Sequence, residues 1–407
     1  MTAAIALLAA AIAPAAFSPQ DPSPAASAQA LVVRGETVYT MAGEPIRDGV
    51  VVVRGGKIVS VGQLAQLPEG VPVLQAKVVT PGLIDAHATV GLSGVLNVPH
   101  DQDQLEASDP VQPELRAIDA YHARDPLVAW VRSLGVTAVH TGHGPGALIS
   151  GQTMVVKTHG RSADEDVVVP LAMVAVTLGD GGRNQDGKSP GTRAKSVAML
   201  REELQRARDY AAKRDRDADA STDLGLEVLG RVLAGDVPLL VTAHRAHDLA
   251  SALRVAEEFG VRVVLDGAAE AYLMLPTLAE KGAWVLPHPP MARTRGELKN
   301  GTMELAKLLF DAKVPFALQS GFESYVPKTR VVLWEAAIAV QHGLPADAAL
   351  RALTLDAARL CGVEARLGSR ATGKDADLAL FDGDPFEYTT HCVGVVVDGV
   401  PYVGSPR

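Results

Sequence analysis

The fold of this chain is decided by the stretch VVTPGLIDAHATVGL, residues 78–92. The apolar run around Pro81-Gly82 is typical of a buried strand with a turn at its boundary. It leads directly into a short polar patch in which Asp85 and His87 stand on either side of Ala86. Because side chains alternate along a strand, Asp85 and His87 are predicted to share one face. The stretch therefore predicts a buried strand that carries a carboxylate and an imidazole near its end.

The segment PGLIDAH, residues 81–87, resembles the first barrel strand of the amidohydrolase superfamily. Members of that superfamily usually continue the strand as His-x-His, so that two imidazoles bind a catalytic divalent metal ion. In this chain the second histidine position is Thr89. The resemblance implies the fold, and it leaves open whether the metal chemistry has moved or has been lost.

The middle of the chain, roughly residues 81–365, alternates short apolar runs with helical periodicity. This alternation is typical of a βα-repeat barrel. Candidate strands end near His87, His140, Thr158, Thr177, Thr242, Asp266, Pro287 and Gln319. We therefore expect an α/β fold with a (β/α)8 TIM-like barrel over residues 81–365.

Both ends of the chain are rich in short alternating strands with glycine turns. Examples are the turn Arg54-Gly55-Gly56-Lys57 and the segment GKDADLALF, residues 373–381. In amidohydrolases a small β-sandwich is built from both chain ends, and Gly-Lys-x-Ala-Asp-Leu is a familiar part of it. The resemblance therefore implies a discontinuous β-sandwich domain made of residues 31–80 and 366–407.

The first residues form an apolar run that is too short to span a bilayer, followed by small-x-small sites such as Ala26-Ser27-Ala28. This pattern predicts a signal peptide over residues 1–28 and a secreted or periplasmic protein. No Lys or Arg precedes the apolar run, so an alanine-rich tail is the alternative. No later segment is long and apolar enough to cross a membrane.

The composition of the chain limits the classes of binding partner that we expect. The 407 residues include 38 Lys and Arg against 47 Asp and Glu, a formal net charge of −9. Nucleic acid is therefore not an expected partner, because binding phosphates needs clustered cations. The two cysteines, Cys361 and Cys392, lack zinc-site spacing and are predicted to be free thiols, with a disulfide between them in an oxidising compartment as the open alternative. A small-molecule ligand in the barrel mouth is the expected partner, and a homo-oligomer stays open.

Further segments, in their order along the chain, resemble a secreted, imidazolonepropionase-like branch of the superfamily: residues 145–152, 243–249, 343–345 and 354–358. The resemblance implies one or two divalent metal ions, such as zinc, at the C-terminal mouth of the barrel. There the metal polarises the scissile carbonyl and lowers the pKa of a bound water. It also implies a hydrolase acting on carbon–nitrogen bonds other than peptide bonds.

Most of the metal ligands that the resemblance implies are replaced. His87 and His244 remain as candidate ligands, while Thr89 and Thr242 stand where further imidazoles are expected. Catalytic zinc usually needs three protein ligands and a water, so two imidazoles alone would hold a metal weakly.

Oxygen and nitrogen donors elsewhere are weaker candidates. Asp85 and Asp266 could bind a hard cation, since the strand that contains Asp266 has no histidine. Lys157 could take the role of a carboxylated lysine, although an exposed surface lysine is the ordinary alternative. Strand eight ends without the expected aspartate, so Glu323 just beyond it is a weak candidate for the general base.

Two functions follow from these replacements. The first is a C–N hydrolase with a reduced or displaced metal site around His87 and His244. The second is a catalytically inactive pseudoenzyme that serves as a secreted ligand- or partner-binding scaffold, with the metal absent. Histidines at other candidate strand ends could build a relocated site, but nothing in their spacing is diagnostic: His140, His143, His159 and His288.

Overall fold

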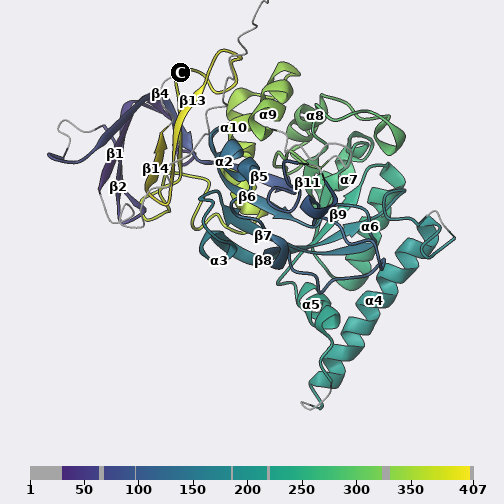
Figure 1. Ribbon diagram of the computed structural model, residues 1–407. Coiled ribbons are helices and arrows are strands. Elements are labelled where there is room, and N and C mark those ends of the chain that lie inside the picture. Colours follow the sequence, from purple (N-terminus) through teal and green to yellow (C-terminus); the bar gives the residue numbers. More distant parts are fainter. Residues whose placement is uncertain are drawn as a thin grey trace, which may run out of the picture.

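The computed structural model describes residues 30–63, 68–96, 98–184, 187–217, 221–322 and 331–403. These residues form two seven-stranded sheets, one from the middle of the chain and one from both ends (Figure 1). The predicted signal peptide and Glu323 lie outside the described residues. No helix in the described part of the chain is long and apolar enough to cross a membrane. Cys361 and Cys392 are free thiols.

The end sheet has the strand order β14-β13-β12-β4-β1-β2-β3. Its strands are β1 (Leu31–Val38), β2 (Ile46–Arg54), β3 (Lys57–Gly62), β4 (Val73–Pro81), β12 (Leu378–Phe381), β13 (Cys392–Val397) and β14 (Val400–Val403). β12 pairs antiparallel with β4, with Leu378 opposite Pro81, so one ladder joins the two ends of the chain.

The end sheet curls around its own apolar core. Ile58 of β3 exchanges backbone hydrogen bonds with Gly373 and Lys374, just before β12, although β3 is the edge strand furthest from β14. Ile58 also shares a core with Val33 of β1 and Val396 of β13. The predicted β-sandwich thus takes the form of one continuous sheet folded over itself.

The barrel sheet has the strand order β11-β10-β9-β8-β7-β6-β5. Its strands are β5 (Leu83–Ala88), β6 (Val136–Gly142), β7 (Ile149–Lys157), β8 (Val167–Thr177), β9 (Leu239–Ala243), β10 (Val263–Gly267) and β11 (Trp284–Pro287). Residues 316–321 nearly close the barrel, because Phe316 bridges Val285 of β11 and Gly321 bridges Ala88 of β5.

One strand departs from the predicted (β/α)8 pattern. β7 runs antiparallel to both β6 and β8. The connection of residues 143–148 is too short for the crossover of a dozen or more residues that a parallel strand needs. As a result Lys157, the last residue of β7, lies opposite Ala138 near the start of β6 and faces the N-terminal end of the barrel.

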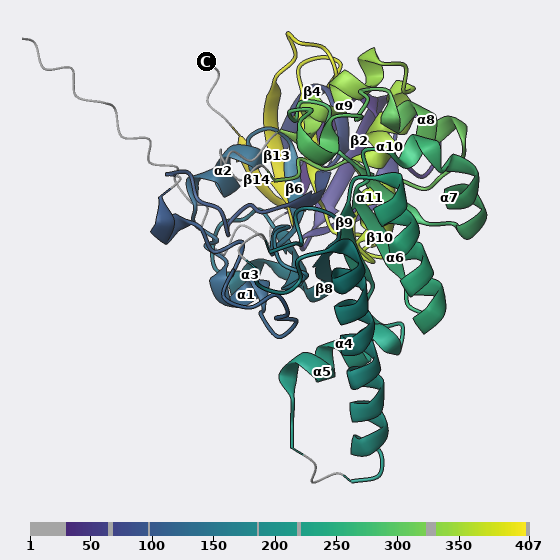
Figure 2. The same ribbon diagram turned by 90° about the vertical axis from the view of Figure 1, so that its right-hand side faces the viewer.

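Helices cover the outside of the barrel: α1 (Ala117–Ala120), α2 (Pro126–Arg132), α3 (Ala163–Asp166), α4 (Arg193–Arg214), α5 (Leu224–Leu233), α6 (Ala246–Phe259), α7 (Leu275–Lys281), α8 (Leu305–Asp311), α9 (Val332–Gln341), α10 (Ala346–Ala352) and α11 (Leu355–Leu360). α6 buries Leu249, Ala252 and Leu253 at helical spacing, in keeping with the helical periodicity of the middle of the chain. α4 is much longer, and with α5 it projects beyond the barrel wall (Figure 2).

Candidate functional site

Buried polar side chains gather at the C-terminal ends of the barrel strands. We call His87, Thr242, Asp266 and Gln319 the mouth cluster. They come from β5, β9, β10 and the segment 316–321, and none is more than 7% exposed. Thr242 and Asp266 are direct neighbours in the parallel register of β9 and β10. The barrel thus brings four residues that are distant in sequence to one place.

The Asp266 carboxylate is the centre of the mouth cluster. Its Oδ2 accepts a hydrogen bond from Thr242 Oγ1 at 2.5 Å, and its Oδ1 accepts one from Gln319 Nε2 at 2.7 Å. His87 Nδ1 lies 3.3 Å from the same Oδ1. Burial alone would raise the pKa of Asp266, but His87 and the two other donors hold that pKa well below its ordinary value. Asp266 is therefore an anion stabilised by protein donors.

His87 is the imidazole partner of Asp266. Burial alone would lower the pKa of His87, but the charges of Asp266 and Asp85 raise it above its ordinary value. Nδ1 faces Asp266, while Nε2 is buried and has no hydrogen-bond partner among the described residues. Asp266 thus orients the imidazole through Nδ1, and Nε2 is available to a ligand.

Asp85 lies beside the mouth cluster and accepts hydrogen bonds from the end of the segment 316–321. Ser320 donates to it twice, from its backbone N–H at 3.0 Å and from Oγ at 2.5 Å. Burial still raises the pKa of Asp85 to about 6. Ser320 and Gln319 are not among the predicted site residues. Their position at the end of candidate strand eight is the signal that could have found them.

His244 directly follows β9 and is in ring contact with His288, at a centroid distance of 5.8 Å. Its Nδ1 is buried without a partner in the described part of the chain, and burial lowers the pKa of its imidazole. A Cβ on Gly267 would come within 2.4 Å of the His244 ring, and Gly267 has a φ of +77°. Only glycine permits this approach.

Two other predicted positions, His140 and Thr89, have structural partners, whereas both ring nitrogens of the buried His143 have none among the described residues. His140 is bonded at both ring nitrogens, to the Ala86 carbonyl and to Thr153 Oγ1, and burial lowers its pKa to about 3. Thr89 accepts a hydrogen bond from Ser93 Oγ at 3.0 Å. These contacts fix the strand ends around the mouth cluster.

Lys157 differs from the expected exposed lysine. It is 2% exposed, and its Nζ lies 2.8 Å from both oxygens of Asp377, 2.9 Å from Asp398 and 3.3 Å from Asp375. Burial alone would lower its pKa, but the three carboxylates raise it. We call these four residues the floor cluster. The reversed direction of β7 places Lys157 there, against the end sheet. His159 also lies on that side, bonded to Asp398 and Tyr402.

The donor set of the mouth does not fit the metal site that the family resemblance implies. Both oxygens of Asp266 already accept protein hydrogen bonds, so a metal that took this carboxylate as a ligand would have to displace Thr242 or Gln319. Thr242 and Gln319 donate to Asp266 instead of completing a ligand set. In the ranges that the structure describes, no group of three or more His, Cys, Asp or Glu side chains is placed to hold a metal ion.

Comparison with known proteins identifies relatives of this fold and sequence. Residues 201–404, half of the chain, match the model of the Amidohydrolase family. A solved structure of an amidohydrolase from Thermotoga maritima MSB8 is 30% identical with a TM-score of 0.86. That similarity covers 92% of this chain and 100% of the other. An adenosine deaminase from Xanthomonas campestris with bound zinc has a similar fold, at 18% identity and a TM-score of 0.57.

Two curated relatives are longer proteins, and each matches this chain over part of its own length. Amidohydrolase tasK of Hapsidospora irregularis is 26% identical over 423 residues, which cover 93% of this chain and 43% of tasK. An N-acyl-D-aspartate deacylase of Alcaligenes xylosoxydans xylosoxydans is 45% identical over 65 residues, 15% of this chain and 13% of the deacylase. The chain thus spans less than half the length of either relative.

Proposed function

This chain belongs to the amidohydrolase family, and from that premise we propose that it is a secreted scaffold that binds a small polar ligand in its barrel mouth without metal-dependent hydrolysis. The observation that carries the proposal is the Asp266 carboxylate, which protein donors occupy on both oxygens. In this reading the positions of the lost ligands have been converted into a hydrogen-bonded network. Fold membership alone does not establish a reaction.

The energetics of the mouth cluster support this reading. A metal that took Asp266 as a ligand would separate it from the Thr242 hydroxyl and the Gln319 amide. Each buried donor left unsatisfied costs about 1–3 kcal/mol. The metal would also compete with the contact between Asp266 Oδ1 and His87 Nδ1, which are 3.3 Å apart. Metal binding at this place therefore has to offset several unfavourable changes.

Unpartnered atoms in the mouth support ligand binding. His87 Nε2, His244 Nδ1 and Gln319 Oε1 are buried and have no hydrogen-bond partner among the described residues. Buried polar atoms are nearly always bonded in folded proteins, to protein groups or to ordered water, so each of these three atoms is open to a partner from outside the chain. A small ligand that carries both donor and acceptor groups is one such partner.

Metal analysis of the full chain, purified without chelator, tests the proposal. We expect far less than one divalent ion per chain and no change in melting temperature when zinc is added. About one tightly bound ion per chain, lost in His87→Ala, would overturn the proposal. His391→Ala is the matched control, because that histidine is exposed on the end sheet.

A second candidate is a C–N hydrolase in which His87 moves protons without a metal. The observation that favours it is the orientation of His87, with Asp266 behind Nδ1 and an open Nε2. A carboxylate oriented in this way fixes the imidazole of many hydrolases. Assays with N-acyl and ureido compounds in the presence of chelator separate the two candidates. Turnover that is lost in His87→Gln supports the hydrolase, whereas no turnover by the unmodified chain supports the scaffold.

A further inference from the structure

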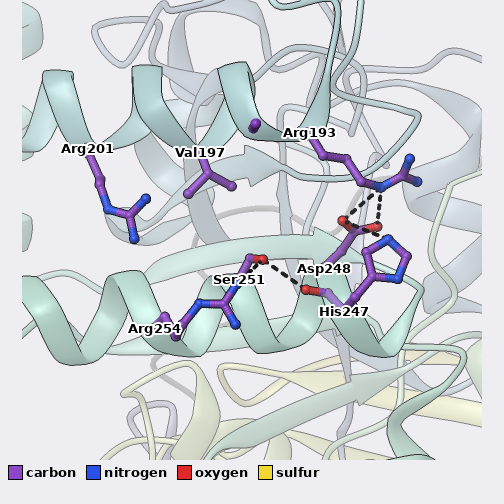
Figure 3. A pocket seen from close by; sticks show the side chains of 8 residues that line it. Arg193, Val197, Arg201, His247, Asp248, Ser251 and Arg254 are labelled. Carbon is purple, nitrogen blue, oxygen red and sulfur yellow. Dashed lines mark hydrogen bonds and ion pairs between the residues drawn. The ribbon is translucent and has the colours of Figure 1, made fainter.

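We propose that the chain has a second binding site, for a phosphate group, in a pocket between α4 and α6 on the outside of the barrel wall. The pocket has a volume of about 260 Å³. Figure 3 shows that one face of each helix lines it, with Arg193, Val197 and Arg201 on α4 and His247, Ser251 and Arg254 on α6. Those positions recur every three or four residues, so each helix presents a single stripe of side chains.

Basic side chains dominate these stripes. Arg201 reaches across from α4, and its Nε also lies 2.6 Å from Glu258 Oε2 of α6. Arg254 donates only to the neutral hydroxyl of Ser251, at 2.8 Å, and no described carboxylate pairs with it. His247 at the N-terminal end of α6 is 57% exposed. The pocket therefore contains one guanidinium whose charge is uncompensated and a second that shares an exposed carboxylate.

Arg193 makes the pocket rigid. Its Nε lies 3.0 Å from Asp248 Oδ1, and its Nη2 lies 2.6 Å from Glu297 Oε1. Asp248 also lines the pocket, but both of its oxygens accept hydrogen bonds from Arg193. This pairing fixes the start of α4 against the start of α6 and engages the acidic group that would otherwise repel an anion.

The chemistry of the pocket fits a phosphate group. A guanidinium presents a planar fork of N–H donors that matches phosphate oxygens, and charge-assisted bonds of this kind are strong. The volume lies just below the roughly 300–1,000 Å³ of pockets that enclose whole organic ligands. A phosphate ion, or the phosphate end of a small monoester, is therefore a better match in size than a larger molecule.

Titration calorimetry of the full chain with inorganic phosphate at constant ionic strength tests the site. We expect saturable binding of one phosphate per chain, weakened about tenfold in Arg254→Gln. Arg34→Gln is the matched control, because Arg34 is an exposed arginine on β1, and binding should not change. Arg254→Lys keeps the charge without the fork and should give an intermediate affinity.

The outcomes are distinct. Absence of saturable binding, or equal weakening in Arg254→Gln and Arg34→Gln, would overturn the site. Circular dichroism of each variant shows whether it is folded, and Arg201→Gln provides a second pocket variant that should also weaken binding. A small phosphate monoester used as a second probe should compete with inorganic phosphate at the same site. Because His87 and His244 take no part, failure of this site leaves the proposed mouth ligand untouched.

Discussion

Each end of the barrel buries a basic side chain beside a carboxylate, and the surroundings of the two side chains differ. At the floor, Lys157 meets Asp375, Asp377 and Asp398. At the mouth, His87 shares Asp266 with two neutral donors and keeps Nε2 without a partner among the described residues. The floor thus uses its charges to join the barrel to the end sheet. The mouth retains open polar atoms, as a binding site requires.

The largest effect is expected at the floor. Lys157→Met would leave the buried Asp377 without its cation, whereas Asp375 keeps Lys57 and Arg366 and Asp398 keeps His159. Removing one partner of a buried ion pair costs about 3–5 kcal/mol. Urea denaturation followed by circular dichroism measures the loss. Lys77→Met, at an exposed position of β4, should change the free energy of unfolding by less than about 0.5 kcal/mol. Similar values for the two variants would remove the distinction between the floor and an ordinary surface.

The free energy of unfolding should depend on pH through Asp85, which lies at the mouth. Its folded pKa of about 6 lies above the ordinary 3.8, so the folded chain binds the extra proton between these values. Stability should therefore fall as the pH rises from about 4 to above 6, by up to roughly 3 kcal/mol. The raised pKa of His87 acts in the same direction at higher pH, with its stabilisation complete below pH 6.5 and lost as the pH rises through the folded pKa.

Asp85→Asn isolates this contribution. The variant should flatten the dependence of unfolding free energy on pH between 4 and 6, measured by urea denaturation at several pH values. Asp266 does not interfere, because its lowered pKa affects stability only as the pH falls below 3.8. An unchanged slope in Asp85→Asn would show that the mouth does not hold this proton.

A smaller effect, of opposite sign, is expected at Arg370. This side chain is 2% exposed, and none of its guanidinium nitrogens has a hydrogen-bond partner among the described residues. Burial pushes its pKa well below the ordinary value. Arg370→Met should therefore stabilise the fold by about 1–3 kcal/mol in thermal or urea unfolding.

Arg132→Met is the matched variant for that measurement. Arg132 is also buried, but it donates to the carbonyls of Thr158 and His159 and lies over the Tyr402 ring. Its replacement should destabilise the fold. If both variants lose stability, burying the Arg370 guanidinium without a partner does not destabilise the fold. The difference between Arg370 and Lys157 in unfolding free energy would then depend on packing alone.

The sequence predicts the barrel well because its strands are apolar runs that a local pattern reveals, as in residues 83–88 and 239–243. It does not predict the direction of β7, which depends on the short connection 143–148. It also misses the burial of Lys157, since its partner Asp377 is 220 residues away in sequence. Gln319 is marked only by its position at the end of candidate strand eight, because a neutral amide becomes informative once the barrel places it beside Asp266.

The ladder between β4 and β12 has a consequence for biosynthesis. β4 is made before the barrel, and its partner β12 is made after it, together with Asp375, Asp377 and Asp398. During translation the β4 edge therefore stays open and the Lys157 amine has no carboxylate from that end. A chain that stops before residue 378 exposes a strand edge that promotes aggregation. Completion of the end sheet thus requires the segment that follows the barrel.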